Sequence, residues 1–465
     1  MPKLDTDYLV VGAGATGMAF ADALIDHADV HVTLLDRRHA AGGHWNDAYP
    51  FVQLHQASVF YGVASTVLGS GAIQQDGPEV GLQERARRAE IQAYYDDILY
   101  RRFLGSGRVT FLPASEYLGS DDGNTHRVVS HVSGEHVEVD VRRRLVDATY
   151  LAPTIPATTP PPFGVTDGAR VVAVNDLPAV VETPGAYVIV GAGKTATDAI
   201  VWLLRNGVEA DRIMWVRPRD PWMLNRACVQ PDPVVALGLA ADTFEAAASS
   251  ASPDEMFLRL EAAGVMLRID PDVLPTMAKT PTLGMWELDL LRTVENVVRN
   301  GHIKGVTAGE IEFEGAVVSL PSNALVVHCA ASGLQYPPMV PIWGQDKVRV
   351  QTSRAGFPCF NAALVGFVEA TRDDDLERNR LCPTNTLPNT TTDWSEMQSR
   401  GAAAAAAFGA EADIAAWANG CALNPARIEP GQRDRPEVLA AAARVAEHAP
   451  PGRARLTKFA GHWIS

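Results

Sequence analysis

The sequence predicts an α/β fold with two similar units, and three observations lead to this prediction. Two glycine-rich turns, "GAGATG" from Gly12 to Gly17 and "GAGKTA" from Gly191 to Ala196, each follow a short apolar run. Each turn precedes a segment with helical spacing. A second apolar run follows each helix and ends in charged side chains. Strand, glycine turn, helix and second strand make up a Rossmann-like dinucleotide-binding unit, so we expect two such units.

The first turn has the glycines that a dinucleotide site needs. The second apolar run, "VHVTLLD", ends at Asp36, 24 residues after Gly12. An acidic side chain at about this distance binds the ribose hydroxyls of an adenosine nucleotide. The first unit therefore suits FAD or NAD, and the residues expected at the site are Gly12, Gly14, Ala15, Gly17, Asp36 and Arg37.

The second turn contains a Gly-Lys-Thr sequence that is similar to a nucleotide-triphosphate loop. That loop requires a glycine five residues before the Gly-Lys pair, and Val188 occupies this position. The pattern is instead that of a second dinucleotide turn, with Lys194 and Thr195 expected at the helix start near a pyrophosphate. Its glycine positions are taken by Gly191, Gly193 and Ala196.

The second unit differs from the first at the end of its second strand, where arginines replace the acid. Arg217 and Arg219 could bind a 2′-phosphate through paired hydrogen bonds, which a carboxylate would repel. This difference favours NADPH as the second ligand. The alternative interpretation is that both arginines are solvated surface charges.

Composition limits the function classes. The 465 residues suggest two or three domains, and the net charge of −15 argues against sequence-independent binding to nucleic acid or to an anionic membrane. Neither a signal-peptide pattern nor a membrane-spanning apolar run is found, so we expect a cytoplasmic protein with a small-molecule substrate. A homodimer is possible. The five cysteines are scattered without a C-x-x-C pair, which predicts reduced thiols and no metal site.

Two further segments suggest how the units are joined. The proline-rich stretch "PATTPPPFG", residues 156–164, is the expected crossing between domains. Residues 234–301 show helical periodicity and are too long for a simple crossover, so we expect a helical insertion that could line a substrate site. Near the end of the chain, the alanine-rich stretch 400–420 is expected to be a scaffold helix.

The chain resembles the flavin-containing monooxygenases and their Baeyer–Villiger and N-hydroxylating relatives. The resemblance lies in "VVGAGATG", "LLDRRHAAGGHWND", "DATYLAP", "VIVGAGKTATD" and "VVHCAASG", which occur in the family's order. It implies an NADPH domain, residues 161–325, inserted into a split FAD domain, residues 1–160 and 326–465, the last part carrying a C-terminal helical tail. It also implies that Gly43, His44 and Trp45 approach FAD.

The sequence departs from this family near the domain junctions. The family pattern F-x-G-x-x-x-H has no counterpart, because no histidine lies between Phe163 and Pro178. The Ala-Thr-Gly strand ends of the family are replaced by Ala148-Thr149-Tyr150 and Ala331-Ser332-Gly333. These changes indicate a divergent branch whose domain hinge is built differently.

The resemblance implies that NADPH reduces FAD and that a C4a-peroxyflavin formed with molecular oxygen then oxygenates a small organic substrate. Gln56, or His55 beside it, lies where relatives place a side chain that steadies this intermediate. We prefer Gln56, because a protonated histidine could accelerate collapse of the peroxide; either residue could instead be an ordinary loop residue. Alternative functions are an NADPH-dependent reductase or oxidase, or a non-catalytic FAD-binding protein. A disulfide reductase needs a cysteine pair that the sequence lacks.

Overall fold

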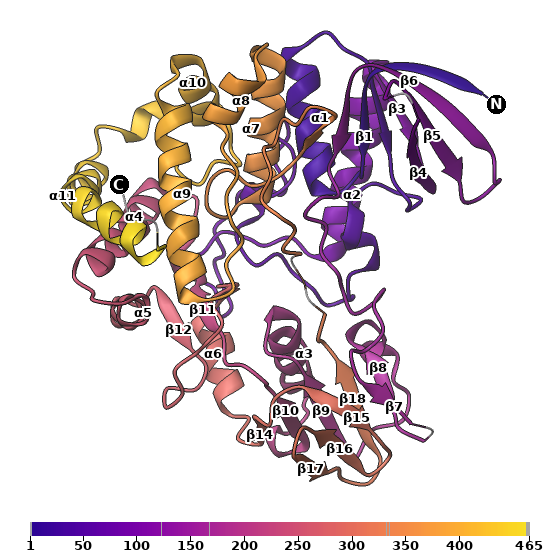
Figure 1. The fold of residues 1–465 in the computed structure, drawn as a ribbon. Helices are drawn as coiled ribbons and strands as arrows, with labels where there is room; N and C mark the ends of the chain where they lie inside the picture. Colours follow the sequence, from indigo (N-terminus) through magenta and orange to yellow (C-terminus); the bar gives the residue numbers. More distant parts are fainter. Residues whose placement is uncertain (1, 122, 167, 332, 334, 462–465) are drawn as a thin grey trace.

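The computed structural model describes residues 2–461 except 122, 167, 332 and 334. Its first sheet has the order β3-β2-β1-β6-β5-β4, and β19 also pairs with β6 (Figure 1). The strands β3, β2, β1, β6 and β19 are parallel to their neighbours, whereas β4, β5 and β6 form an antiparallel meander. The strands are β1 (Lys3–Val11), β2 (Val32–Leu35), β3 (Val109–Leu112), β4 (Ser115–Ser120), β5 (Thr125–Ser130), β6 (His136–Asp147) and β19 (Lys347–Arg349).

The second sheet is entirely parallel and has the order β14-β10-β9-β18-β8. A smaller sheet, β17-β16-β15-β7, packs against it through a shared apolar core. The strands of the two sheets are β7 (Gly164–Val165), β8 (Val171–Ala173), β9 (Ala186–Val190), β10 (Ile213–Val216), β14 (Val297–Val298), β15 (Ile303–Val306), β16 (Glu310–Phe313), β17 (Ala316–Ser319) and β18 (Ala324–His328).

The two predicted Rossmann-like units are confirmed, and the second is inserted between β6 and β19 of the first. The chain crosses once through the proline-rich stretch 156–164 and returns before β19. The two crossings run side by side, because Thr154 pairs with Gly333 and the Tyr150 hydroxyl donates to the Pro338 carbonyl over 2.6 Å. The expected domain end at residue 325 falls inside β18, which continues to His328. Ser332 lies outside the described residues.

Helices cover the first sheet. Helix α1 (Ala15–His27) packs closely on α7 (Pro358–Thr371), since a Cβ at Gly366 would stand 2.4 Å from the Phe20 carbonyl oxygen. Around them lie α2 (Arg88–Asp97), α8 (Asp375–Leu381), α9 (Thr391–Gly409) and α10 (Ala412–Gly420). The single helix expected over 400–420 is therefore the end of α9 and the whole of α10.

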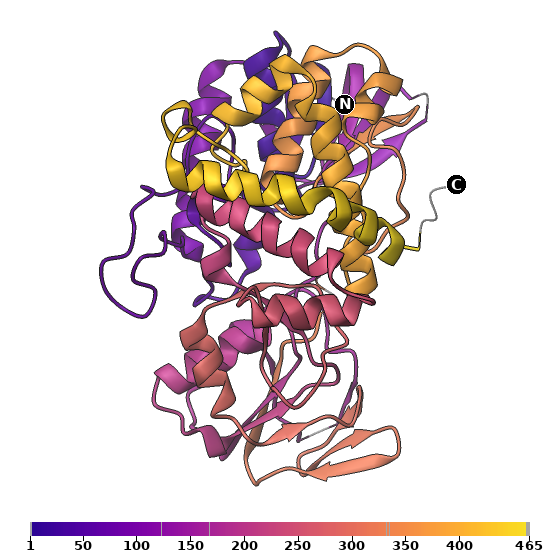
Figure 2. The ribbon, with the colours of Figure 1, turned by 90° about the vertical axis from the view of Figure 1, so that its left-hand side faces the viewer.

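The insertion expected to be helical over 234–301 is mixed. It contains α4 (Pro233–Ala248), α5 (Pro253–Ala262) and α6 (Met285–Arg292), but also β12 (Met266–Arg268) and β13 (Thr282–Leu283), which flank β11 (Trp222–Asn225). Helix α4 lies against the C-terminal helix α11 (Pro436–Phe459), as Figure 2 shows. The helical expectation was wrong for β12 and β13, because both strands pair with β11 across the sequence.

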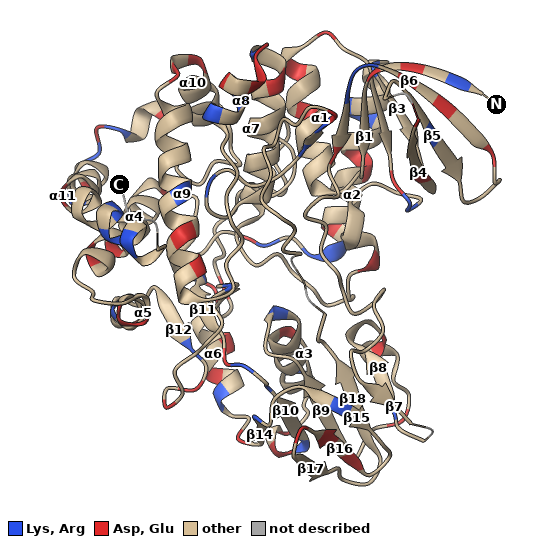
Figure 3. Cartoon of the chain, in the orientation of Figure 1, with Lys and Arg blue, Asp and Glu red and all other residues tan. Residues whose placement is uncertain are grey.

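Charged residues of both signs are distributed over both units (Figure 3). Within the described chain, no helix combines the length and apolar character needed to cross a bilayer.

Candidate functional site

The first glycine turn has the geometry expected of a dinucleotide site. Gly12 has a φ of +103°, and a Cβ at Gly17 would stand 1.9 Å from the Gly12 carbonyl oxygen, so only glycine fits these two positions. The carboxylate of Asp36 accepts hydrogen bonds from the N–H groups of Ala13 (2.8 Å) and Arg38 (2.9 Å). Asp36 therefore lies at the turn, as the spacing predicts, whereas Arg37 is exposed.

The Gly42-Gly43 turn packs directly on the first glycine turn. The Gly42 N–H donates to the Ala13 carbonyl over 2.8 Å, and a Cβ at Gly43 would stand 2.8 Å from the Gly14 Cα. The short 3-10 helix Gly43–Asp47 then carries His44 and Trp45, whose rings stack with centroids 5.4 Å apart. Burial lowers the pKa of His44 to about 4. Gly43, His44 and Trp45, which the resemblance groups near FAD, therefore lie beside the first turn.

The second glycine turn leaves backbone open for a ligand. Gly191 has a φ of +133°, and its carbonyl accepts a hydrogen bond from the Trp215 indole over 2.7 Å. No described atom lies within 4 Å of the place where a Cβ of Gly193 would stand. Ala196 is fully buried beneath the turn, and Thr195 is partly exposed at the start of α3 (Lys194–Arg205).

Lys194 lies away from this open backbone. Its ammonium group pairs with Asp198, one helical turn further on, and with Glu287 at 3.3 Å. A contact of Lys194 with a pyrophosphate stays a prediction, because the side chain is already engaged with two carboxylates in this structure.

The two arginines after β10 are both engaged with protein groups. Arg217 is 1% exposed, stacks over Trp215 at 4.6 Å and pairs with Asp220 at 3.0 Å. Its Nε and Nη1 atoms have no hydrogen-bond partner among the described residues, and burial lowers the pKa of Arg217 to about 10. Arg219 donates to Asn389 (3.1 Å) and to Thr276. Binding of either to a 2′-phosphate stays a prediction.

The segment 49–56, which contains both predicted catalytic residues, joins the two units. The Tyr49 hydroxyl donates to Asp198 over 2.7 Å, and Phe51 stacks on Trp202 with centroids 4.9 Å apart. The His55 carbonyl accepts from Arg226 Nε (2.9 Å) and from the Thr282 hydroxyl, so the backbone next to Gln56 is tied to the insertion.

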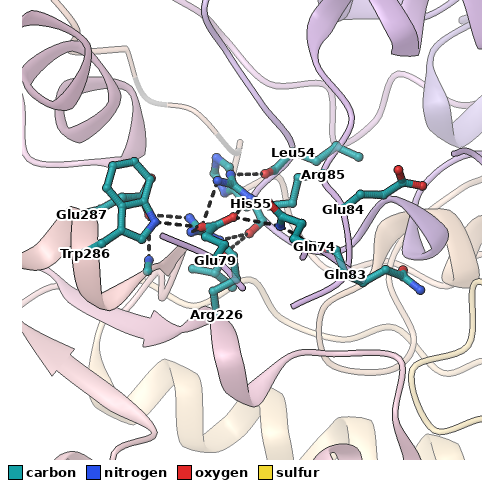
Figure 4. Close-up of polar contacts among 12 residues, drawn as sticks. Leu54, His55, Gln74, Glu79, Gln83, Glu84, Arg85, Arg226, Trp286 and Glu287 are labelled. Carbon is teal, nitrogen blue, oxygen red and sulfur yellow. Dashed lines mark hydrogen bonds and ion pairs between the residues drawn. The ribbon is translucent and has the colours of Figure 1, made fainter. Parts of the chain in front are cut away.

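A buried group of charges surrounds this segment, which we name the seam cluster: Glu79, Arg85, Lys194, Asp198, Arg226 and Glu287. Figure 4 shows Arg226 between Glu79 and Glu287; it contacts Glu287 at 2.6 Å, and Arg85 contacts Glu79 at 3.0 Å. Sequence spacing does not reveal this cluster, because Arg226 lies 147 residues from Glu79 and 61 from Glu287. No spacing rule connects residues so far apart.

The seam cluster sets the charge states around it. Burial alone would raise the pKa of Glu287, but the positive charges of Lys194, Arg226 and Arg85 lower it to about 2. Burial lowers the pKa of His55 well below its usual value, and the same cations lower it further. His55 is therefore a neutral imidazole at physiological pH.

Two cavities of about 300 Å³ each open beside the seam cluster. Gln53 and Arg85 line both of them, so the two cavities adjoin at these side chains. One cavity extends along residues 74–90 and the other along α3 and α6.

The five cysteines, all in the described part of the chain, are free thiols, as predicted, and four of them are buried. Burial raises the pKa of Cys359 to about 12 and those of Cys228 and Cys421 to about 11. These thiols are therefore protonated at physiological pH.

Comparisons with known proteins agree with the fold. Residues 10–70 match the family model of the NAD(P)-binding Rossmann-like domain. Solved structures of a cyclohexanone monooxygenase and of a steroid monooxygenase bound to NADP are similar, with TM-scores of 0.51 and 0.52. Both are 15% identical to this chain and match 79% of it. The match covers 88% of the cyclohexanone monooxygenase chain and 85% of the steroid monooxygenase chain. At this identity the likeness shows the two-Rossmann-domain architecture of flavin monooxygenases.

Two mycobacterial proteins are much closer in sequence. They are uncharacterized protein Rv2000 of Mycobacterium tuberculosis (strain H37Rv) and uncharacterized protein Mb2023 of Mycobacterium bovis. Each is 41% identical over 397 residues, which are 85% of this chain and 73% of the relative. The chain therefore belongs to the protein family of Rv2000 and Mb2023.

Proposed function

We propose that the protein is an FAD-dependent, NADPH-reduced monooxygenase of a small organic substrate. The observation that carries this proposal is a short path of contacts between the two glycine turns. Gly14 touches Gly43 in the first unit, and Tyr49, six residues further on, bonds to Asp198 one helical turn after Gly193 and Lys194. Two dinucleotides held at these turns would extend toward the same segment of chain.

The residues around the first turn suit FAD. Backbone N–H groups at the start of α1 would face its pyrophosphate, and Asp36 would bind the ribose, since a carboxylate that accepts two hydrogen bonds still has free lone pairs. Gly43, His44 and Trp45 would lie along the ring system.

The open backbone at Gly193 suits the pyrophosphate of NADPH, and the unpartnered Nε and Nη1 of Arg217 suit its 2′-phosphate. When both are bound, FAD would take a hydride from NADPH and activate molecular oxygen.

Segment 49–56 would face the reacting atoms. His55 is neutral, so it supplies no imidazolium proton there. The Gln56 amide could donate an N–H without transferring a proton, and the neutral imidazole of His55 could do the same, so either residue could be the orienting group. The hydrogen bond from the Trp45 indole to the Tyr61 hydroxyl, 2.5 Å long and buried, would help to exclude water.

Two other functions use the same cofactors. A reductase or oxidase without oxygen insertion, and a flavoprotein without turnover, would have the same turns. A disulfide reductase is disfavoured by the chemistry of the thiols, because Cys359 and Cys421 are buried and protonated rather than reactive thiolates.

The proposal predicts that the purified protein is yellow and that NADPH bleaches it under anaerobic conditions faster than NADH does. When oxygen is readmitted, a transient absorbance should appear before the spectrum of oxidised flavin returns. In a reductase the oxidised spectrum would return without this transient. A colourless protein that takes up no FAD would contradict the redox assignment. A yellow protein that neither nicotinamide bleaches would favour the binding protein.

A further inference from the structure

The cavity along α3 and α6 lies beside the nucleotide turns rather than in them. Its lining on α3 runs from Asp198 to Arg205 and continues to Asn206 just after the helix; it begins one helical turn after the residues Gly191–Lys194. Its other walls come from α6 and from Phe51 and Gln53 of segment 49–56. A volume of about 300 Å³ is at the small end of ligand pockets and suits a molecule of one or two rings.

The walls of this cavity favour a planar ring. Phe51 and Trp202 are stacked nearly parallel, with an interplanar angle of 19°, and the indole of Trp286 forms part of a further wall. Aromatic side chains bind flat rings through offset or edge contacts, in addition to the gain from burying apolar area.

The carboxylates in the lining are already satisfied. Asp198 accepts from the Tyr49 hydroxyl and pairs with Lys194. Glu287 accepts from Arg226 and from the Gly284 N–H at 2.7 Å, and it also pairs with Lys194. Neither carboxylate therefore needs a cationic ligand.

One cation of the lining has a different environment. Arg205 is exposed, and its guanidinium lies over Trp286 with its central carbon 5.4 Å from the ring centroid. Among the described residues it forms no ion pair and no hydrogen bond. Stacking covers one face of a guanidinium but leaves its edge N–H groups free, and that edge matches a carboxylate. By contrast, Arg85 is already bonded to Glu79 and to the Leu54 carbonyl.

We propose that this cavity binds a small planar aromatic carboxylate. Its ring would lie among Phe51, Trp202 and Trp286, and its carboxylate would pair with the edge of Arg205. The lining holds two cations, Arg85 and Arg205, and two carboxylates, Asp198 and Glu287; of these four charges Arg205 alone has no ionic partner among the described residues. The binding site does not depend on the redox chemistry proposed above.

The test is calorimetric titration of the purified protein with 2-naphthoate, 2-naphthylmethanol and 2-naphthylmethylamine, which differ chiefly in charge. We expect saturable one-to-one binding of the carboxylate, at least about tenfold tighter than that of the alcohol and the amine. Arg205→Gln should weaken naphthoate binding about tenfold or more, and Arg205→Lys should restore part of it. Arg101→Gln, which changes an exposed arginine that pairs with Asp97 and does not line the cavity, should have no effect.

Three outcomes would overturn the proposal. The first is equal binding of the alcohol or the amine, and the second is unchanged naphthoate binding by the Arg205 variants. The third is displacement of naphthoate by saturating NADP⁺, which would place the ligand at the nucleotide turn. Trp286→Leu gives an independent check, because it removes a wall of the cavity and should also weaken binding.

Discussion

Three histidines have a lowered pKa in the folded protein because they are buried: His44, His55 and His328. Each is neutral in the folded state at physiological pH but becomes an ordinary, more basic imidazole when the chain unfolds. Because the unfolded state then binds more protons, their contribution to stability is complete above about pH 6.5 and is lost as the pH falls below that value.

The free energy of unfolding should therefore fall as the pH is lowered from about 6.5 to 5, by up to about 1.4 kcal/mol per pH unit for each histidine. His44→Gln should reduce this slope by about one proton, since His44 has a folded pKa of about 4. Urea unfolding at a series of pH values measures the slope. His31→Gln, at an exposed position, is the control and should leave it unchanged. An equal slope in wild type and His44→Gln would contradict the prediction.

At the scale of single residues, sequence spacing was informative only for groups fixed to a glycine turn. Asp36 lies beside its turn, as the spacing predicts, because the strand and helix between it and Gly12 have a nearly constant length; its binding of a ribose stays a prediction. Arg217 occupies the corresponding place in the second unit, yet it is buried against Trp215 and Asp220. Both neighbours are local in sequence, Trp215 in β10 and Asp220 three residues after Arg217, but the spacing does not show that they enclose the guanidinium.

At the scale of elements, the two turns differ in the space that they leave for a side chain at their glycines. Gly17 serves the packing of α1 against its own turn, since a side chain there would overlap the Gly12 carbonyl. Gly193 has ordinary backbone angles, with a φ of −84°, and open space beyond it. One glycine is required by the fold, and the other is required only if a ligand approaches.

The matched variants Gly17→Ala and Gly193→Ala test this difference. Gly17→Ala should lower the free energy of unfolding by several kcal/mol, through displacement of α1, and should reduce FAD uptake. Gly193→Ala should keep wild-type stability but weaken NADPH binding at least about tenfold, because the methyl group occupies space expected for the pyrophosphate. Thermal unfolding and coenzyme titration measure the two effects. Wild-type NADPH affinity in Gly193→Ala would argue against a nucleotide at this turn.

The insertion shows why element prediction was only partly successful. Helices α4 and α5 follow from local periodicity and from the capping residues Asp232 and Ser252. Strands β12 and β13 are two or three residues long and exist because β11 lies between them. Local pattern carries no information about such partners.

At the scale of the whole molecule, the inserted unit is held in two ways. The paired crossings near Thr154 and Gly333 provide the covalent hinge. The non-covalent contacts are an apolar core that continues between the units and the seam cluster, in which Arg226 is 1% exposed and joins Glu79 of the first unit to Glu287 of the insertion. Removing one member of a buried ion pair leaves its partners as uncompensated charges, which is costly.

Arg226→Met should therefore lower the free energy of unfolding by about 3–5 kcal/mol. The urea transition should shift to lower concentration without dividing into steps, because one apolar core continues from Val10 of the first unit to Ile189 of the second and still joins them. Tryptophan fluorescence and circular dichroism would report the shift. The control, Arg259→Met, breaks an exposed pair with Glu255 and should change stability by no more than about 1 kcal/mol. Adding Glu287→Leu to Arg226→Met should recover part of the loss, since it removes one buried carboxylate. A barely shifted transition in Arg226→Met would show that the seam cluster contributes little to the stability of the protein.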